Sequence, residues 1–245
     1  MRVLLAIDVG NTNTVLGLFD GKRLKKSWRI ISRPKAILAV LKKIPNPIDG
    51  IIISSVVPSL DKPLRRIVKS LSGKEPLFVH SRTKMPIRIR VKNPHEVGAD
   101  RIVNAVAAYE KYKRALIIID LGTATTFDVV TARGEYIGGT ITPGIGIANE
   151  ALAARCSKLP FVPLSQPKKA IGKTTVEAIR SGVYWGYVGL IDEMVRRLSR
   201  DLKSKPLVIA TGGLATFMAK NSKAIQKVDG DLTLRGLQIL ADYWR

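Results

Sequence analysis

Two short segments of the chain place a glycine two positions after an aspartate, at the end of an apolar run. Asp8-Val9-Gly10 follows the apolar residues that begin at Val3, and Asp120-Leu121-Gly122 follows those that begin at Ala115. Residues typical of a second strand come next, so each segment predicts a tight strand–turn–strand unit. Glycine at the third position permits backbone conformations closed to other residues and lets backbone N–H groups approach an anion.

The composition of these turns favours a phosphate-bearing ligand. Neutral hydrogen-bond donors follow in both, namely Asn11, Thr12, Thr123 and Thr125. Because a carboxylate repels phosphate, Asp8 and Asp120 each require a cation or water, and Mg²⁺ suits one or two carboxylates with phosphate oxygens. One such turn would be an ordinary hairpin, but two with matching flanks, followed by Thr211-Gly212-Gly213, favour phosphate binding. The chain has no GxxxxGK[ST] motif and is therefore not a P-loop enzyme.

A third candidate motif, Gly98-Ala99-Asp100-Arg101, opens a predicted helix over residues 98–112. The start of a helix offers N–H groups and a positive dipole end to an anionic group. Arg101 can pair with a carboxylate. Asp100 can accept a proton from a hydroxyl, and in phosphoryl transfer such a group mainly orients the nucleophile. A helix cap beside an arginine explains the motif equally well.

The two Asp-x-Gly segments belong to a longer internal similarity. Residues 7–12 recur as residues 119–123, and in each half a later strand ends in small residues before a helix. This repeat predicts two α/β half-domains, residues 1–113 and 114–245, packed about a pseudo-twofold axis with a cleft between them. We expect strands over 3–9, 14–19, 51–54, 115–119, 125–130, 136–141 and 206–210, and helices over 60–71, 98–112, 175–198 and 232–244.

Composition excludes several classes of protein. Hydrophobic residues make up 46% and charged residues 24% of the 245, which is typical of a globular chain. No apolar run reaches about 18 residues, so we expect no membrane span. Asp8 interrupts the apolar opening, which is typical of a buried strand and not of a signal peptide, so we expect a cytoplasmic protein. Cys156 is the only cysteine, which excludes an intramolecular disulfide and a cysteine cluster for zinc.

The net charge is unusually positive. Forty-one Lys and Arg face nineteen Asp and Glu, for a formal charge of +22. Such a surface attracts polyanions, either ATP or nucleic acid. The basic residues are dispersed and lack the interleaved aromatics of single-strand binders. We therefore expect a solvated basic surface and leave nucleic-acid binding as the less favoured alternative.

Taken together, the motifs resemble the type III pantothenate kinases, of the actin-like (acetate and sugar kinase) superfamily. They occur in the family's order over nearly the whole chain: Asp8 to Thr12, Ser54 to Pro58, Asn93-Pro94, Gly98 to Arg101, Asp120 to Thr125, Gly138 to Gly144, Thr175, Ser181-Gly182 and Thr211 to Gly213. The resemblance implies an α/β fold of two duplicated actin-like (ribonuclease H-like) half-domains flanking a central nucleotide cleft. It also implies transfer of the ATP γ-phosphate to the pantothenate hydroxyl to give 4'-phosphopantothenate, the first step of coenzyme A synthesis.

The resemblance further implies a role for individual residues. Asp100 matches the family's general base, Asp120 a site for a monovalent cation (K⁺ or NH₄⁺), and Asp8 is the candidate ligand for Mg²⁺. The expected contacts to ATP and its phosphates are Asp8, Val9, Gly10, Asn11, Thr12, Asn13, Thr14, Val15 and Thr123. The expected contacts to pantothenate are Gly98, Ala99, Asp100, Arg101 and Thr175, the last near a subunit interface, since members of this family are homodimers.

Three features depart from the family pattern. Val91 stands where a tyrosine usually contacts pantothenate, the segment 31–49 is shorter than in most relatives, and the charge of +22 is more basic. Two alternatives follow: a nucleotide-binding regulatory (transcription-related) protein on the same fold, or a superfamily kinase with a different substrate. The presence of Asp8, Asp100 and Asp120 together favours an enzyme.

Overall fold

The chain is organised as two compact units. The computed structural model describes residues 3–44 and 47–244, so the outermost residues of the two expected half-domains, 1–2 and 245, lie outside the described residues. Unit 1 comprises Met1–Lys113, Arg133–Ile137 and Asp231–Arg245, and unit 2 comprises Arg114–Ala132 and Gly138–Gly230. The last helix thus joins unit 1. The half-domain limits expected from the sequence, 1–113 and 114–245, and the nucleotide cleft remain predictions.

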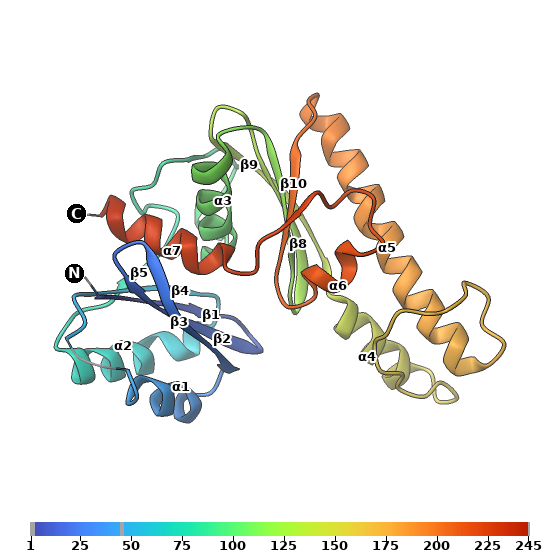
Figure 1. The fold of residues 1–245 in the computed structure, drawn as a ribbon, viewed down its shortest axis with the longest axis horizontal. Coiled ribbons are helices and arrows are strands. Elements are labelled where there is room, and N and C mark those ends of the chain that lie inside the picture. The colour runs from blue at the N-terminus through green and yellow to red at the C-terminus, as the bar shows by residue number, and fades with distance from the viewer. Residues whose placement is uncertain (1–2, 45–46, 245) are drawn as a thin grey trace. The chain divides into compact units, whose positions relative to one another are not determined.

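Unit 1 is built on a five-stranded sheet with the order β3-β2-β1-β4-β5 (Figure 1). Its strands are β1 (Val3–Val9), β2 (Asn13–Asp20), β3 (Arg23–Ile31), β4 (Gly50–Ser55) and β5 (Leu77–Phe78). β1 pairs antiparallel with β2 and parallel with β4, which places Asp8 beside Ser54. The carboxyl ends of β1 and β4 therefore meet at one edge of the sheet.

Helices cover both faces of this sheet (Figure 1). On one face, α1 (Pro34–Leu41) and α2 (Pro58–Ser72) bury Ile37 and Leu64 against alternate β1 residues such as Ile7. On the other face, α3 (Ala99–Tyr112) packs against α7 (Leu232–Tyr243), and both contact β4. A 3₁₀ turn, η1 (Pro94–Glu96), precedes α3. β6 (Arg88–Ile89) pairs with Glu135 and Tyr136.

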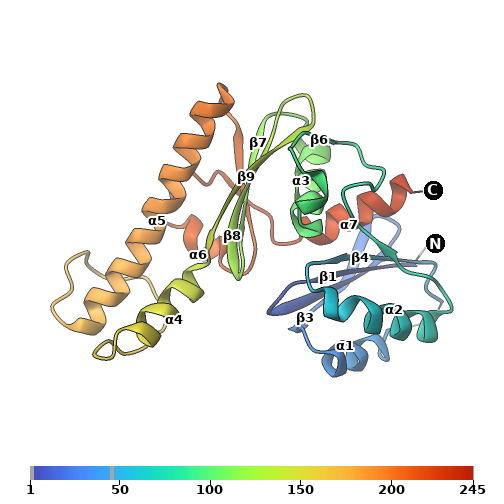
Figure 2. The same cartoon turned by 180° about the vertical axis from the view of Figure 1, so that it is seen from behind.

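Unit 2 repeats the central strand arrangement of unit 1. Its strands run in the order β11-β10-β7-β8-β9. They are β7 (Leu116–Leu121), β8 (Ala124–Val130), β10 (Leu207–Thr211), β11 (Lys227–Val228) and, from Gly138 onward, β9 (Glu135–Pro143). β7 pairs antiparallel with β8 and parallel with β10, as β1 does with β2 and β4. The helices are α4 (Ile145–Arg155), α5 (Thr175–Leu202) and α6 (Ala215–Ala219), and the long α5 runs beside the strands (Figure 2).

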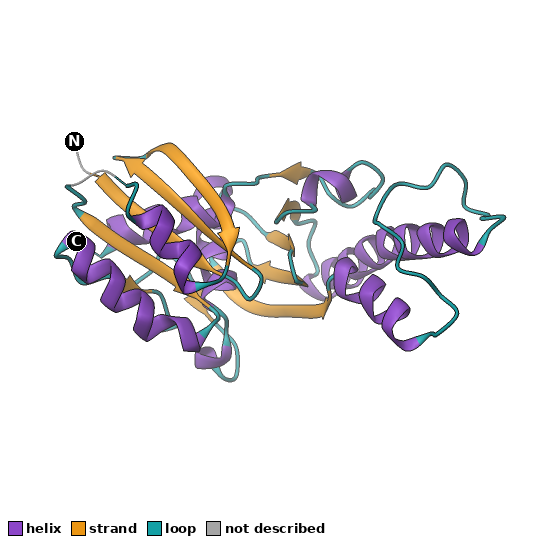
Figure 3. Ribbon diagram, turned by 90° about the horizontal axis from the view of Figure 1, so that it is seen from below, coloured by secondary structure: helices purple, strands orange, loops and turns teal. Residues whose placement is uncertain are grey.

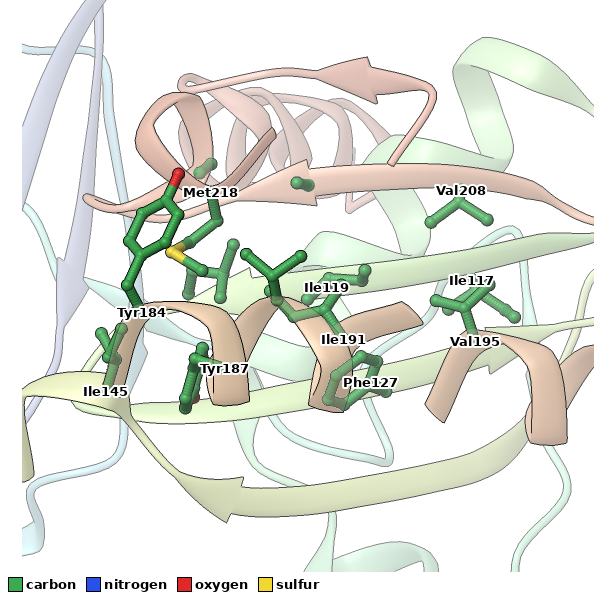
Figure 4. Close-up of a cluster of buried hydrophobic side chains, with 14 of the residues drawn as sticks. Ile117, Ile119, Phe127, Ile145, Tyr184, Tyr187, Ile191, Val195, Val208 and Met218 are labelled. Carbon is green, nitrogen blue, oxygen red and sulfur yellow. The ribbon is translucent and has the colours of Figure 1, made fainter. Parts of the chain in front are cut away.

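One apolar face of α5 anchors unit 2. Tyr184, Ile191 and Val195, spaced as one face of a helix, pack with β-strand residues such as Ile119 and Phe127 (Figure 4). Ile119, Phe127 and Ile191 are fully buried. This core fixes the strand ends of unit 2 that carry the second Asp-x-Gly turn.

Every strand and helix expected from the sequence is present, with ends shifted by at most four residues. The sequence pattern did not predict α1, α4, α6 and several strands, of which β3 is the longest. β3 is an edge strand whose exposed face is rich in Lys and Arg, so it lacks an apolar run. Among the described residues, no helix is both long and apolar enough to cross a membrane.

Candidate phosphate-binding and catalytic site

The turn between β1 and β2 is tight and exposed. Val9 and Thr14 form the last pair of the ladder, and the Gly10 N–H donates to the Asn13 carbonyl at 3.0 Å. Asn11 and Thr12, at the tip, are exposed to solvent. The structure therefore places the predicted residues 8–15 in one strand–turn–strand unit whose tip is accessible to a ligand.

Ser32, which follows β3, holds this turn in place. Its Oγ donates to the Gly10 carbonyl at 2.5 Å and lies 2.9 Å from Thr14 Oγ1. Its N–H donates to the Thr12 carbonyl at 3.0 Å. Ser32 could not be identified from the sequence, because its role depends on the pairing of β3 with β2.

Asp8 shares the carboxyl edge of the sheet with the end of β4. Asp8 and Ser54 are direct partners in the parallel β1–β4 ladder, so their side chains point to the same face. Ser54 Oγ is buried and has no hydrogen-bond partner among the described residues. A buried hydroxyl without a partner is costly, so this edge of the sheet can accept a further polar group.

The start of α3 brings Asp100 to the same edge. Gly98 is the N-cap of α3, and the Arg101 N–H donates to Asp100 Oδ1 at 2.8 Å. A Cβ at Gly98 would lie 2.6 Å from Asp100 Oδ1 and 3.6 Å from Val56 Cγ1. The Val56 N–H in turn donates to the Val9 carbonyl at 3.0 Å. Glycine at position 98 therefore allows the Asp100 carboxyl to lie close to the ends of β4 and β1.

The surroundings of Asp100 change its acidity. Burial raises the pKa of the Asp100 carboxyl above its usual range, while the backbone N–H and the charge of Arg101 act in the opposite direction. The Arg101 guanidinium lies 5.9 Å from the centre of the Tyr136 ring. A carboxylate that holds its proton more tightly is also a better acceptor for the proton of a hydroxyl.

The turn between β7 and β8 is held by residues from two other elements. The Gly122 N–H donates to the Ala124 carbonyl at 3.1 Å, and Gly144, which precedes α4, donates its N–H to the Thr123 carbonyl at 3.1 Å. The Tyr187 hydroxyl, on α5, is hydrogen-bonded to Thr125 Oγ1 and to the Pro143 carbonyl. Thr123 itself is exposed, so the tip of this turn is accessible as well.

Gly212 lies directly against Asp120. Thr211 and Asp120 are partners in the parallel β10–β7 ladder. Gly212 has a φ of +91°, and a Cβ there would lie 2.5 Å from Asp120 Oδ1. Both the backbone conformation and the space therefore require glycine. The sequence marked Thr211-Gly212-Gly213 but gave no signal that it packs on Asp120.

Few side chains at these turns can ligate a metal. In residues 3–44 and 47–244, no group of three or more His, Cys, Asp and Glu side chains is arranged to hold an ion. A divalent ion bound at Asp8 or Asp120 would therefore take most of its ligands from phosphate oxygens and water. That ligand set is the one magnesium prefers.

Thr175 lies apart from the second turn within unit 2. It is the first residue of α5, follows the N-cap Thr174, and is exposed. Tyr187, which holds Thr125, is twelve residues further along the same helix. At about 1.5 Å per residue, Thr175 is roughly 18 Å from that contact. The structure therefore does not bring Thr175 to the Thr123 turn of its own unit.

Comparison with known proteins agrees with this geometry. The family described as type III pantothenate kinase matches residues 4–197. A type III pantothenate kinase of Desulfatibacillum aliphaticivorans is 50% identical in an alignment of 252 positions, which covers 98% of this chain and 98% of the relative. The regulatory alternative is not favoured by these relatives.

Solved structures share the fold at low sequence identity. A protein of Campylobacter jejuni named as a Baf family transcriptional activator is 20% identical, with a TM-score of 0.62 over 97% of both chains. MreB 5 of Spiroplasma citri, solved with bound AMPPNP, is 10% identical, with a TM-score of 0.54 over 99% of this chain and 96% of that one. These likenesses confirm the expected actin-like fold. The matched family model and the relatives that cover nearly the whole chain show that it belongs to the type III pantothenate kinases.

Proposed function

We propose that the protein transfers the γ-phosphoryl group of ATP to the hydroxyl of pantothenate, giving 4'-phosphopantothenate, the first step of coenzyme A synthesis. The observation that carries this proposal is the position of Asp100. Its carboxyl lies at the start of α3, close to the end of β4, and burial raises its pKa. Relatives that are named as type III pantothenate kinases and match nearly the whole chain support the choice of substrate.

Asp100 would act on the acceptor hydroxyl. When ionised, it accepts a hydrogen bond from the hydroxyl, orients the oxygen toward the γ-phosphorus, and takes the proton as the new P–O bond forms. Positioning and charge neutralisation dominate phosphoryl transfer, so the orienting role is the larger one. Arg101, on the first turn of α3, is suited to the pantothenate carboxylate, with Gly98 and Ala99 completing the contact.

The two Asp-x-Gly turns would bind the nucleotide. The exposed tips at Asn11, Thr12 and Thr123 present polar groups to the phosphates. Asp8 would hold Mg²⁺ together with phosphate oxygens and water. The bound ion supplies neutralisation of the charge on the phosphate oxygens.

Asp120 would hold the monovalent cation, K⁺ or NH₄⁺. Its carboxylate lies against the backbone at Gly212, so the site offers a carboxylate beside backbone groups. We expect Asp120→Ala to abolish activation by potassium. Asp120→Asn keeps the side-chain volume and serves as the control for packing. An unchanged potassium response in Asp120→Ala would remove this residue from the cation site.

We also propose a cytoplasmic homodimer. Most of the exposed large apolar side chains of unit 2 lie on β9, α4, the connection to α5, and α5 itself: Ile141, Ile147, Phe161, Ile171 and Val176. Exposed apolar groups of this kind mark interaction surfaces. Thr175, which is distant from the Thr123 turn of its own unit, would then contact pantothenate in the site of the partner subunit.

The direct test is ADP release from ATP with and without pantothenate, in the presence of Mg²⁺ and K⁺. We expect release that depends on pantothenate and falls when potassium is replaced by sodium. Release that is equal with and without pantothenate would contradict the proposal. A panel of other alcohols would then test whether Val91 accompanies a changed substrate, and salt-sensitive binding of duplex DNA would test the regulatory alternative.

A further inference from the structure

The connection that precedes α5 forms a hollow outside the Asp-x-Gly turns. The hollow is lined by residues 166–169, 171–173, Glu177 and Arg180, all within unit 2. It encloses about 1070 Å³, the open space at its mouth included. Figure 3 shows this connection as a long loop that returns to the start of α5. Thr175 is not among the lining residues.

The lining is strongly positive. Lys168, Lys169, Lys173 and Arg180 contribute four positive charges, and Glu177 contributes the single negative one. The Glu177 carboxylate already accepts a hydrogen bond from the Lys173 backbone N–H at 2.7 Å. Positive charges gathered in a hollow attract anions more strongly than the same charges spread over a convex surface.

Arg180 supplies an unused donor in this hollow. Its Nε is buried and has no hydrogen-bond partner in the described part of the chain. Leaving a buried donor of a charged group unsatisfied costs free energy that a bound acceptor would recover. Guanidinium groups are especially suited to phosphate oxygens.

The loop is held firmly over the first turns of α5. Ser181 Oγ donates to the Ala170 carbonyl at 2.5 Å. Gly172 lies against the helix backbone, where a Cβ would be 2.3 Å from the Ala178 nitrogen. Thr174 caps the helix by accepting from the Glu177 N–H at 3.2 Å. The lysines of the loop are therefore presented from a fixed backbone, which reduces the entropy cost of binding.

We propose that this hollow is a binding site for a phosphate dianion, distinct from the two Asp-x-Gly turns and from the Gly98–Arg101 segment. The Arg180 guanidinium binds the phosphate oxygens, and Lys168, Lys169 and Lys173 neutralise the charge. The same chemistry serves inorganic phosphate and a phosphate monoester. The proposal does not rest on the kinase activity, because it concerns binding alone.

The test is calorimetric titration of the full-length protein with inorganic phosphate at low salt, without ATP or pantothenate. We expect a class of phosphate site that is weakened at least tenfold in Lys168→Gln/Lys169→Gln and in Arg180→Gln. The matched control is Lys22→Gln/Lys25→Gln, which removes two exposed charges from β3 and the turn before it. We expect that control to change the affinity less than twofold. Equal phosphate binding by the wild type and both hollow variants would overturn the proposal.

A second titration identifies the source of the phosphate. Glycerol 3-phosphate is the probe for a phosphate monoester. If inorganic phosphate binds at least as tightly as glycerol 3-phosphate and competes with it, the hollow is assigned to free phosphate. If glycerol 3-phosphate binds more tightly, the hollow is assigned to a phosphorylated metabolite. Thermal unfolding of each variant verifies its fold, since the substituted lysines are exposed. Monoester binding that does not respond to Arg180→Gln would contradict the assignment.

Discussion

Burial at the start of α3 gives Asp100 a property that an exposed aspartate lacks. Its carboxyl keeps its proton to a pH above the usual pKa of 3.8. Between that value and the raised pKa, the folded protein binds a proton that the unfolded chain has released. The contribution of Asp100 to the free energy of unfolding is therefore greatest at acid pH and falls as the pH rises through the raised pKa.

We predict that Asp100→Asn separates catalysis from folding. Asparagine keeps an oxygen that can accept from the Arg101 N–H but cannot take a proton, so turnover should fall about 100-fold or more. The variant should be at least as stable as the wild type at neutral pH, because no charge is buried. The measurements are kcat and urea unfolding at several pH values. Turnover equal to that of the wild type would remove Asp100 from the mechanism.

Gly212 and Gly213 form a matched pair for a second prediction. Gly212→Ala introduces a methyl group 2.5 Å from Asp120 Oδ1 in a backbone with φ of +91°, whereas a methyl at Gly213 meets nothing within 4 Å. We expect Gly212→Ala to lower the free energy of unfolding by about 1–3 kcal/mol and to weaken the potassium response. Gly213→Ala should change neither. Equal thermal unfolding of the two variants would show that the Asp120 site tolerates the methyl group.

At the residue scale, composition and spacing identified the turns but not the groups that hold them. Asp8, Asp100 and Asp120 could be marked because an acidic residue beside glycine is a local pattern. Ser32 and Tyr187 could not be marked, because each meets its turn only through pairing or packing of segments distant in sequence.

At the element scale, the end of β3 is the support for the first turn. The Ser32 side chain is bonded to the Gly10 carbonyl and to Thr14, whereas its backbone N–H bond to Thr12 does not depend on the side chain. We predict that Ser32→Ala lowers the free energy of unfolding by about 1 kcal/mol, because the side-chain hydrogen bonds to the turn are lost. We also expect the KM for ATP to rise several-fold, with little change in the KM for pantothenate.

Ser27 supplies the control for this prediction. It lies on β3, five residues before Ser32, and is exposed. Steady-state kinetics of Ser27→Ala should match the wild type in both substrates. If Ser32→Ala leaves the KM for ATP unchanged, then the hydroxyl does not support nucleotide binding.

The elements that the sequence missed share a physical cause. β3 and α4 lack the periodic apolar stripe by which exposed elements are recognised in a sequence. β3 is an edge strand with a charged outer face. α4 buries only Ile145 and Asn149 along its length. Strands buried on both faces, such as β7, were predicted closely because their apolar runs are continuous.

At the scale of the whole molecule, the duplication could be predicted because both halves repeat the same strand–turn–strand motif. β7 pairs antiparallel with β8 and parallel with β10, just as β1 pairs antiparallel with β2 and parallel with β4. Membership of α7 in unit 1 could not be predicted, because its contacts with α3 join residues more than a hundred positions apart.

The proposed homodimer makes a prediction that no single chain can satisfy. If Thr175 completes the site of the partner subunit, Asp100→Asn and a bulky Thr175→Phe variant should each be inactive alone. In a mixed dimer, one site would carry both defects and the other would carry neither. Mixing the two inactive proteins under conditions that exchange subunits should therefore restore about a quarter of the wild-type activity.

The controls decide between action within one subunit and action across the dimer. Each variant exchanged with itself should stay inactive, and sedimentation should show a dimer in every case. If Thr175 serves its own subunit, each site of the mixed dimer carries one defect and no activity returns. That outcome would leave unexplained why the start of α5 is exposed and roughly 18 Å from the Tyr187 contact at the second turn. Restored activity would instead account for that separation, since the residue would be needed at the partner's site and not at its own.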